Sequence, residues 1–423
     1  MHDEGMFTPT RAAGLQSLAD FVTRAGSDYA RDRNYDTGPS RENVSSLSPY
    51  LRHRLLTERE VVAAVLERHS LGSSEKFVQE VFWRTYWKGW LEQRPEVWRR
   101  YRRDLAELEL SGGYSSGDYE EAIAGRTGID AMDAWVSELV DTGYLHNHTR
   151  MWFASIWIFT LGLPWQLGAD FFYRHLLDGD AASNTLSWRW VAGLQTAGKT
   201  YLATASNISR FTEGRFSPSG LATTARSLVE EPLPSPERIA PAESTPVKGR
   251  VGLLLHEEDL DAASLRDDYP WLDDARLDHA RLDHDRLDSN SGLVAVAGSA
   301  DPDSRSPSGA SEAVRQFTAS ALDDGVTRAS LALGRPARVL PDALPSTVLE
   351  WAASERLDAV VVPYSPVGPV QERMRTLDAA LASEAVVLTP VRRRWDTLAW
   401  PHAARGFFPF REQIAGLLRQ QGL

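Results

Sequence analysis

The chain has 423 residues, a length that predicts two or three domains. Of these residues 42% are hydrophobic and 25% are charged, which is typical of a globular protein. It contains no cysteine, which excludes disulfides and cysteine-ligated zinc or iron–sulfur sites. The net charge of -12 argues against indiscriminate nucleic-acid binding, although a local basic face could still dock a duplex.

The N-terminal residues, MHDEGMFTPT, have no basic head followed by an apolar run, so we expect no secretory signal. The most apolar run, residues 151–163, is too short to cross a bilayer and predicts a buried core helix. The expected location is the cytoplasm.

The first 222 residues predict an all-helical domain. Residues 15–28 have helical spacing, and Thr57 with Glu60 forms a capping box that opens the next helix. A third helix is expected over residues 74–90, which Pro95 follows. The bulky aromatic side chains on it are more often plain core than a functional site.

A change of composition over residues 223–248, which are rich in Pro, Ser and Glu, predicts an extended linker. After it, short Val- and Leu-rich runs alternate with helical segments. The expected strands are 251–256, 293–298, 337–340, 359–363 and 385–389, and the expected helices are 311–323, 347–355 and 370–382. This alternation predicts a Rossmann-like, doubly wound parallel α/β domain over residues 249–423. No GxGxxG or GxxxxGK[ST] follows any strand, so no motif supports dinucleotide or phosphate binding there.

An RLD repeat of five-residue period occupies residues 275–290. Because this period matches neither a helix nor a strand, the repeat predicts a solvated insertion at about residues 267–291. His279 and His284 could be read as weak metal ligands, but the insertion is favoured and no metal site is predicted.

The region 128–193 is unusually rich in Trp and also contains polar residues in apolar surroundings. Its polar residues are His146, Asn147, His148, Arg150, Asp178 and Asp180. An Arg and an Asp among buried aromatics are costly unless they compensate each other or hold a polar ligand. The region therefore predicts a cofactor pocket, with a buried salt bridge between helices as the alternative.

Several segments resemble, in order, the FAD-binding helical domain of the photolyase and cryptochrome family over roughly half the chain. They are Tyr29 with RDRNY at 31–35, NVSSLSPYL at 43–51, VFWRTYW at 81–87, TGIDAMDA at 127–134, TGYLHNHTRM at 142–151, DGDAASN at 178–184, SWRWVAG at 187–193 and GRFSPSG at 214–220. The resemblance implies a bent FAD deep in the helical domain.

The resemblance also assigns residues to FAD. They are Tyr29, Val44, Ser45, Ser46, Leu47, Ser48, Trp83, Arg84, Asn147, Arg150, Asp178, Gly179, Asp180 and Asn184. The hydroxyl and backbone N–H groups of 43–48 suit a pyrophosphate. By family position Arg150 pairs with Asp178 beside the flavin, and Asp180 lies near the polar edge of the ring. Asn184 takes the place opposite flavin N5, where Asn is the usual choice of a photolyase.

Electron transfer to the flavin runs along a chain of three Trp residues in the family. Trp188 matches the member next to the flavin and Trp165 the middle member. The third is missing near Gly112, so Tyr114 or another Trp, such as Trp152 or Trp157, could replace it.

Substrate recognition departs from the family pattern. The residues that the resemblance assigns to DNA are Thr85, Asn147, His148, Met151 and Trp190. Thr85 replaces an acid that contacts the damaged bases, and His148 replaces an Arg. Trp190 could stack on an extruded base. His146 is a candidate for proton transfer and for tuning the flavin.

The order of the domains is the second departure, because the family's α/β antenna domain normally comes first. The C-terminal segments RVGLLLHEEDL and RGFFPFREQIAGLL are similar to the first and last parts of that domain. The chain therefore resembles a circularly permuted member, and whether the α/β domain holds a second antenna chromophore stays open.

Two functions follow from the resemblance. The first is light-dependent repair of pyrimidine lesions in DNA by an electron from reduced FAD. The second is a cryptochrome-like photoreceptor that acts on a signalling partner without repair. Asn184, Met151 and Trp190 favour the first, whereas Thr85, His148 and the acidic charge favour the second, or an unusual substrate such as single-stranded DNA. A light-independent flavoenzyme is a distant third.

Overall fold

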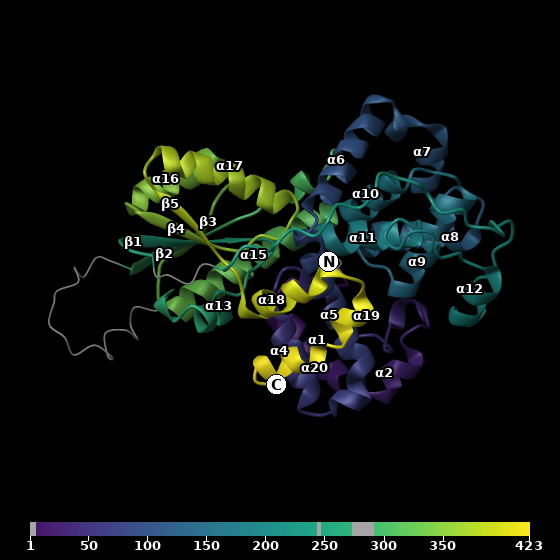
Figure 1. Cartoon of the computed structure of the whole chain (residues 1–423), viewed down its shortest axis with the longest axis horizontal. Coiled ribbons are helices and arrows are strands. Elements are labelled where there is room, and N and C mark those ends of the chain that lie inside the picture. The colour runs from purple at the N-terminus through teal and green to yellow at the C-terminus, as the bar shows by residue number, and fades with distance from the viewer. Residues whose placement is uncertain (1–5, 243–246, 273–291) are drawn as a thin grey trace, which may run out of the picture.

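The computed structural model describes residues 6–242, 247–272 and 292–423 and contains a helical part and an α/β part (Figure 1). The RLD repeat of residues 275–290, with His279 and His284, lies outside the described residues. Of the insertion predicted at about 267–291, only residues 267–272 are described, and they contain the end of helix α13 and a 3₁₀ turn. None of the helices in the described ranges is long and apolar enough to span a membrane.

Residues 6–211 form the helical part. Its helices are α1 (Arg11–Phe21), α2 (Ser27–Asp32), α3 (Ser48–Arg52), α4 (Glu58–Leu66), α5 (Leu71–Glu92), α6 (Pro95–Leu110), α7 (Gly117–Ile123), α8 (Asp130–Thr142), α9 (Asn147–Ser155), α10 (Trp165–His175), α11 (Ala181–Val191) and α12 (Ala205–Phe211). Thr57 caps α4, because its hydroxyl accepts a hydrogen bond of 3.2 Å from the backbone N–H of Glu60. The predicted helix start is confirmed, but the Glu60 carboxylate binds Arg11 and does not complete the predicted capping box.

The predicted helix over 15–28 is interrupted. Helix α1 ends at Phe21, a 3₁₀ turn follows, and α2 begins after Gly26. A Cβ atom at Gly26 would lie 2.8 Å from Nδ1 of His69, whose Nε2 lies 2.8 Å from the carbonyl oxygen of Val22. The close packing of His69 against this turn thus fixes a break that the apolar spacing of the sequence does not reveal.

The α/β part is built on a five-stranded sheet of order β3-β2-β1-β4-β5, and its strand pairs are all parallel. The strands are β1 (Arg250–His256), β2 (Gly292–Ser299), β3 (Ala337–Val339), β4 (Ala359–Pro363) and β5 (Val387–Val391). The helices are α13 (Ala262–Asp268), α15 (Glu312–Leu333), α16 (Pro345–Glu355), α17 (Pro369–Ser383), α18 (Arg394–Ala399), α19 (Phe407–Arg411) and α20 (Ile414–Gln420). This is the predicted fold class, a helical domain followed by a doubly wound α/β domain.

Strand β1 shows why the sheet has helices on both faces. Leu253 and Leu255 belong to the core that includes α13 and α15, whereas Leu254 packs with side chains of α16 and α17. Successive side chains of a strand point to opposite faces, so an unbroken apolar run needs cover on both sides.

The bounds of one strand and one helix differ from their predictions. Strand β5 covers Val387–Val391 instead of 385–389, because Ala385 has a φ of +58° in the turn that follows α17. Helix α15 also continues ten residues past the predicted end at 323, to Leu333.

The C-terminal helices lie on the helical part of the molecule (Figure 1). The Trp395 ring of α18 packs on Phe82 of α5, with ring centroids 4.8 Å apart. Phe407 of α19 stacks on Trp83 of α5 at 3.5 Å. The predicted α/β domain, residues 249–423, thus ends in helices whose buried faces contact the other domain.

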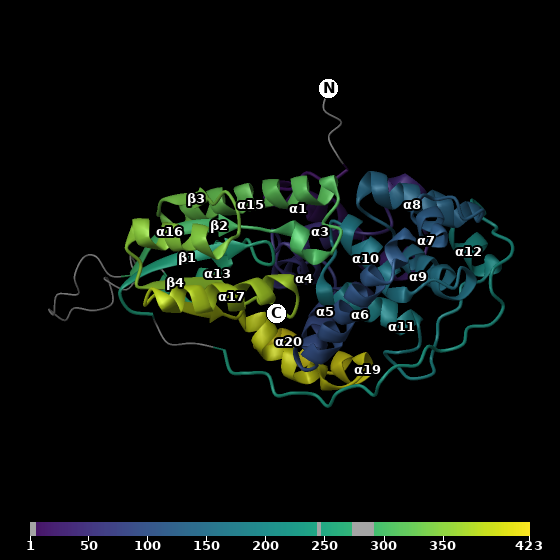
Figure 2. The ribbon, with the colours of Figure 1, turned by 90° about the horizontal axis from the view of Figure 1, so that it is seen from above.

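The described residues between α12 and β1 contain no helix or strand and cross the surface as a long extended segment (Figure 2). Glu230 of this segment pairs with the buried Arg189, and the N–H of Glu237 donates to the carbonyl of Gln93. The predicted linker 223–248 is therefore attached to both α11 and the end of α5.

Candidate functional site

The loop between α10 and α11 presents two carboxylates that are each bound by an arginine. Arg150 of α9 donates from both terminal nitrogens to Asp178, at 3.0 and 2.8 Å. Arg84 of α5 donates to Asp180 at 2.6 Å. Both carboxylates are nearly inaccessible, with side chains 3% and 2% exposed. The structure thus brings Arg84, Arg150, Asp178 and Asp180 together, as the sequence predicts.

The local sequence fixes the shape of this loop. Asp180 caps α11, because its carboxylate accepts the N–H of Ser183 at 2.8 Å. Arg52 of α3 donates to the carbonyl of Gly179 at 2.6 Å, which orients the backbone between the two acids. Burial alone would raise the pKa of both Asp178 and Asp180, but Arg150 and Arg84, respectively, lower it. Both acids therefore carry a charge at neutral pH.

The segment 43–48 lies against the same loop. Asn43 fixes its start by donating to the carbonyls of Asp32 and Tyr35 at 2.9 and 2.7 Å. The hydroxyl of Ser48 is a hydrogen-bond partner of Asp178, and Ser46, with a φ of +50°, is a partner of Tyr144. The serines and Val44 remain partly exposed, whereas Leu47 is buried.

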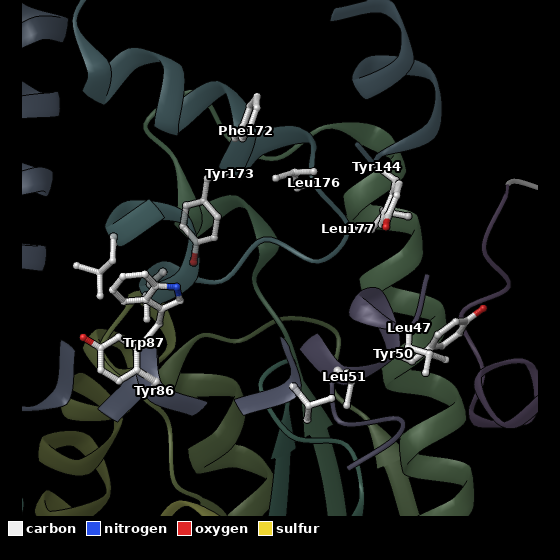
Figure 3. Close-up of a cluster of buried hydrophobic side chains, with 14 of the residues drawn as sticks. Leu47, Tyr50, Leu51, Tyr86, Trp87, Tyr144, Phe172, Tyr173, Leu176 and Leu177 are labelled. Carbon is white, nitrogen blue, oxygen red and sulfur yellow. The ribbon is translucent and has the colours of Figure 1, made fainter. Parts of the chain in front are cut away.

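A cluster of buried apolar side chains, drawn in Figure 3, comes from α3, α5, α10 and the loops beside them. Leu47 and Tyr50 come from the segment at α3, Tyr144 and Leu177 from the two loops, and Trp87 from α5. All five are at most 8% exposed. The guanidinium of Arg150 lies 5.4 Å from the centre of the Tyr144 ring, so this apolar cluster borders the polar one at Tyr144.

These surroundings fit FAD. Arg150 and Arg84 keep 24% and 12% of their side chains exposed although the carboxylates they bind are buried. Guanidinium N–H groups, serine hydroxyls and the turn at Ser46 supply donors for a pyrophosphate, and neighbouring aromatic side chains such as Tyr144 suit a flat ring system. Arg84, Arg150, Ser46 and Ser48 are the residues that would hold the cofactor.

His146 has structural contacts at both ring nitrogens. Its Nδ1 accepts the N–H of His148 at 3.2 Å, which caps α9, and its Nε2 lies 3.1 Å from the carbonyl of Arg33. Burial, followed by the nearby His148, lowers the pKa of His146 to about 4, against the attraction of Asp36. The ring is therefore neutral at pH 7, and its contacts do not support the predicted proton transfer.

We expect His146→Asn to change how stability depends on pH. Because its pKa is lowered in the folded state, His146 takes up a proton on unfolding, so the wild type loses stability as pH falls from about 6.5 towards 4. Asn can still cap α9 but does not titrate. Between pH 7.5 and 5 the wild type should lose about 2 kcal/mol more than the variant, measured by urea denaturation. Equal losses would contradict this assignment.

Trp188 of α11 lies among aromatic rings. Its ring centroid is 5.1 Å from Phe172, 6.2 Å from Trp157 and 6.3 Å from Phe153. Trp165 instead stacks on Tyr101 at 5.6 Å. Among the described residues, the Trp188 ring thus contacts Trp157. It does not contact Trp165, which the sequence predicts as the middle Trp of the electron-transfer chain.

Asn184 and Tyr29 are both buried, at 7% and 8% exposed. The amide Nδ2 of Asn184 donates to the carbonyl of Ala169 at 2.7 Å, which fixes the orientation of the amide. The Tyr29 ring packs at 5.3 Å against Phe77 of α5. Their roles towards FAD stay predictions.

The structure corrects the assignment of Thr85 to DNA. Thr85 is 1% exposed, and its hydroxyl accepts the indole N–H of Trp395 at 2.9 Å. It therefore lies inside the contact between α5 and α18, where DNA does not reach it. Trp83, a predicted FAD residue on the same helix, is likewise covered by the stacked ring of Phe407.

The other predicted substrate residues lie nearer the surface. Trp190, His148 and Met151 are half-buried and Asn147 is exposed. Tyr201 connects two of them, because its ring stacks on Trp190 at 5.7 Å and its hydroxyl lies 3.4 Å from Nε2 of His148. We name Trp190, Tyr201 and His148 the aromatic surface group.

Sequence reasoning missed Tyr201 and Arg52. Nothing in the residues around Tyr201 distinguishes it from an ordinary loop tyrosine. Arg52 carried a signal, because the cluster Arg52, His53 and Arg54 follows an apolar segment, and buried cations need partners.

A separate cleft of about 1150 Å³ lies between α1 and α4 on one side and α13 and α15 on the other. Several of its charges are paired, as in Arg11 with Glu60 at 2.5 Å and Arg328 with Asp324 at 2.7 Å. None of the residues that the sequence predicts for FAD or DNA lines this cleft.

Comparison with known proteins agrees with this location. Residues 77–219 match the FAD binding domain of DNA photolyase. The deoxyribodipyrimidine photolyase of Vibrio cholerae is 30% identical over 209 residues, which are 48% of this chain and 43% of the relative. That of Streptomyces griseus is 35% identical over 189 residues, which are 44% of this chain and 39% of the relative. A class III photolyase structure from Agrobacterium tumefaciens is 27% identical, covers 49% of this chain and 43% of that one, and has a TM-score of 0.40.

Residues 77–219 of the helical domain are therefore similar to the FAD-binding domain of DNA photolyases, which indicates FAD as the cofactor. The chain spans less than half the length of these relatives. The match to the FAD binding domain covers residues 77–219 and so does not test a second chromophore in the α/β domain.

Proposed function

We propose that this protein is a light-driven, FAD-dependent photolyase that repairs pyrimidine lesions in DNA by an electron from reduced FAD. The observation that carries the proposal is the loop 178–180, bound by Arg84 and Arg150 and leading into the helix that contains Trp188, inside the region that matches the FAD domain. The relatives named deoxyribodipyrimidine photolyase support the same reaction.

The residues of the chain would have three tasks in this reaction. Arg84, Arg150 and Ser48 bind and orient the cofactor, and the surrounding apolar side chains exclude water. Asn184 presents an amide, which stays uncharged over the whole pH range of the reaction. Bound FAD supplies the electron when excited by blue light.

The aromatic surface group is the proposed contact with the lesion. Trp190 and Tyr201 are already stacked at 5.7 Å, so an extruded base could extend the stack without ordering new side chains. His148 lies at its edge and can donate or accept a hydrogen bond.

A cryptochrome-like photoreceptor is the second candidate. The net charge of -12 disfavours binding to DNA phosphates, and Phe407 of the C-terminal segment covers Trp83. Light would then change the contacts of that segment with α5, and this change would alter binding of a signalling partner. Cytoplasmic location remains a prediction in both cases.

Repair can be tested directly. FAD-loaded protein, chemically reduced, is mixed with an oligonucleotide that carries one pyrimidine dimer, single-stranded in one arm and double-stranded in the other. We expect the dimer to disappear under blue light and to persist in the dark. Trp190→Ala should weaken binding to the damaged strand but leave the flavin spectrum unchanged. Persistence of the dimer under light in both arms would rule out repair and favour the photoreceptor.

A further inference from the structure

A continuous row of aromatic rings leads from Trp188 towards the surface by way of α7. The Trp188 and Trp157 centroids are 6.2 Å apart, Trp157 and Tyr119 are 6.0 Å apart, and Tyr119 and Tyr114 are 5.6 Å apart. The first three rings are at most 2% exposed, and Tyr114 is partly exposed. The row thus joins the buried core to solvent through neighbouring rings.

The backbone holds the first two rings of this row in contact. A Cβ atom at Gly168 would lie 2.3 Å from the Trp188 ring and 2.9 Å from the Trp157 ring, so only Gly lets both pack on α10. Trp157 lies in a π-helical turn (Ile156–Thr160), a local feature frequent at functional sites. Its indole N–H donates to the carbonyl of Pro164 at 2.9 Å, which fixes the ring.

The two ends of the row differ in whether a proton acceptor lies beside them. The buried indole N–H of Trp188 has no hydrogen-bond acceptor among the described residues. The hydroxyl of Tyr114 donates to Oδ2 of Asp170 at 3.0 Å. An oxidised Trp188 therefore cannot pass its proton to a neighbour, whereas an oxidised Tyr114 can.

We propose that Trp157, Tyr119 and Tyr114 carry electrons from the surface to Trp188 during light-driven reduction of FAD, and that Asp170 accepts the phenolic proton of Tyr114. The proposal rests on the proposed function, because it requires light-excited FAD as the oxidant. It places the surface end of the electron path at Tyr114, reached through Trp157 rather than through Trp165.

The step balances as follows. One electron passes from Trp188 to light-excited, oxidised FAD and is replaced from Trp157. The electron lost by Trp157 is replaced from Tyr114 by tunnelling across the Tyr119 ring, which bridges the two without being oxidised, because its buried hydroxyl has no hydrogen-bond partner among the described residues to take its proton. Tyr114 loses its O–H proton to Asp170 and becomes a neutral radical. A thiol in solution returns one electron and one proton to Tyr114 and is itself oxidised, and Asp170 releases its proton to solvent.

The surroundings of Asp170 suit a proton acceptor. Burial raises its pKa to about 6, although hydrogen bonds from Ser306 and Tyr114 oppose the shift. The charged and titratable groups around it are Arg102, Arg174, Tyr101, Tyr114 and Tyr119. Asp170 is thus mostly ionised at pH 7.5 and mostly protonated below pH 6, so trapping of the Tyr114 radical should decline over that range.

Tyr114→Phe provides the decisive test. FAD-loaded protein is illuminated with dithiothreitol as the thiol, while flavin absorbance gives the reduction rate and electron paramagnetic resonance records the tyrosyl radical. We expect Tyr114→Phe to abolish the radical signal and to slow reduction by about an order of magnitude. Asp170→Asn should also lose the radical signal. The matched control is Tyr364→Phe, which removes another partly buried tyrosine hydroxyl bound to a carboxylate, Glu92, at 2.8 Å.

Two further measurements separate this path from its alternatives. Trp157→Phe should slow reduction as Tyr114→Phe does. An unchanged rate and radical signal in Tyr114→Phe, or slowing by Trp165→Phe but not by Trp157→Phe, would overturn the proposal. Repair by dithionite-reduced Tyr114→Phe protein should equal that of the wild type, because that reaction starts from reduced FAD. Loss of repair in the wild type would instead count against the proposed function alone.

Discussion

Replacing Arg54 with methionine should lower the free energy of unfolding by about 3–5 kcal/mol, the cost of leaving buried charges without their partner. Arg54 binds three carboxylates, each on a different element. They are Glu58 of α4 at 3.3 Å, Asp259 after β1 at 3.1 Å and Asp396 of α18 at 2.6 Å. All four side chains are at most 3% exposed. The substitution therefore leaves an acidic cluster inside the contact between the two domains.

The loss should shrink as pH falls. In the wild type, Arg393 and Arg54 lower the pKa of Asp259 against the effect of burial, so its stabilisation is present above its unfolded pKa and disappears only in strong acid. Without Arg54 the buried carboxylates should have raised pKa values. The variant then gains stability by taking up protons as pH falls from about 8 to about 5.

Urea denaturation followed by circular dichroism at the two pH values measures both effects. Arg31→Met is the control, because Arg31 pairs with Asp28 and Asp32 at the exposed surface of α2. It should leave the midpoint near that of the wild type. A midpoint for Arg54→Met no lower than that of Arg31→Met would show that the cluster is not held by this residue.

Local patterns in the sequence predicted most of the fold. The Thr57 cap depends on residues three positions apart, and the apolar run of β1 depends only on the composition of the run itself. The break at Gly26 was missed because it depends on His69, which lies 43 positions later in the chain. The position of the C-terminal helices was missed for the same reason, since the partners of Trp395 and Phe407 are on α5.

Some features of the candidate site could likewise be predicted from the sequence, and others could not. Arg150 and Asp178 were paired by the resemblance, and the structure brings them together. Thr85 was placed by its position after Trp83 and Arg84, but the direction of its side chain is set by α18, for which the linear motif carries no information. The row from Trp188 to Tyr114 depends on ring distances between four separate elements, which no spacing rule contains.

The second prediction with a large effect concerns Arg150. Arg150→Met should weaken FAD binding by about tenfold to a hundredfold, because charge-assisted hydrogen bonds of this kind contribute about 1.5–3 kcal/mol each. The variant should also unfold more easily, since Asp178 is left buried and unpaired. FAD content per protein, from absorption spectra, and the urea midpoint report the two effects separately.

A double substitution distinguishes a cofactor site from a salt bridge that only joins helices. Arg150→Met with Asp178→Leu removes both charges and should recover much of the stability lost in Arg150→Met, because no unpaired charge remains. FAD binding should stay weak if the guanidinium binds the cofactor. Recovery of FAD binding together with stability would instead make the pair a structural bridge.

Arg189→Met completes the comparison, because it breaks the ion pair of another buried arginine, with Glu230, on the helix that follows the loop 178–180. This variant should lose stability and keep its FAD. If it lost FAD as fully as Arg150→Met does, the cofactor would be responding to general loosening of the helical domain. Loss of FAD only in the Arg150 variants would place the guanidinium of Arg150, rather than the stability of the bundle, at the centre of cofactor binding.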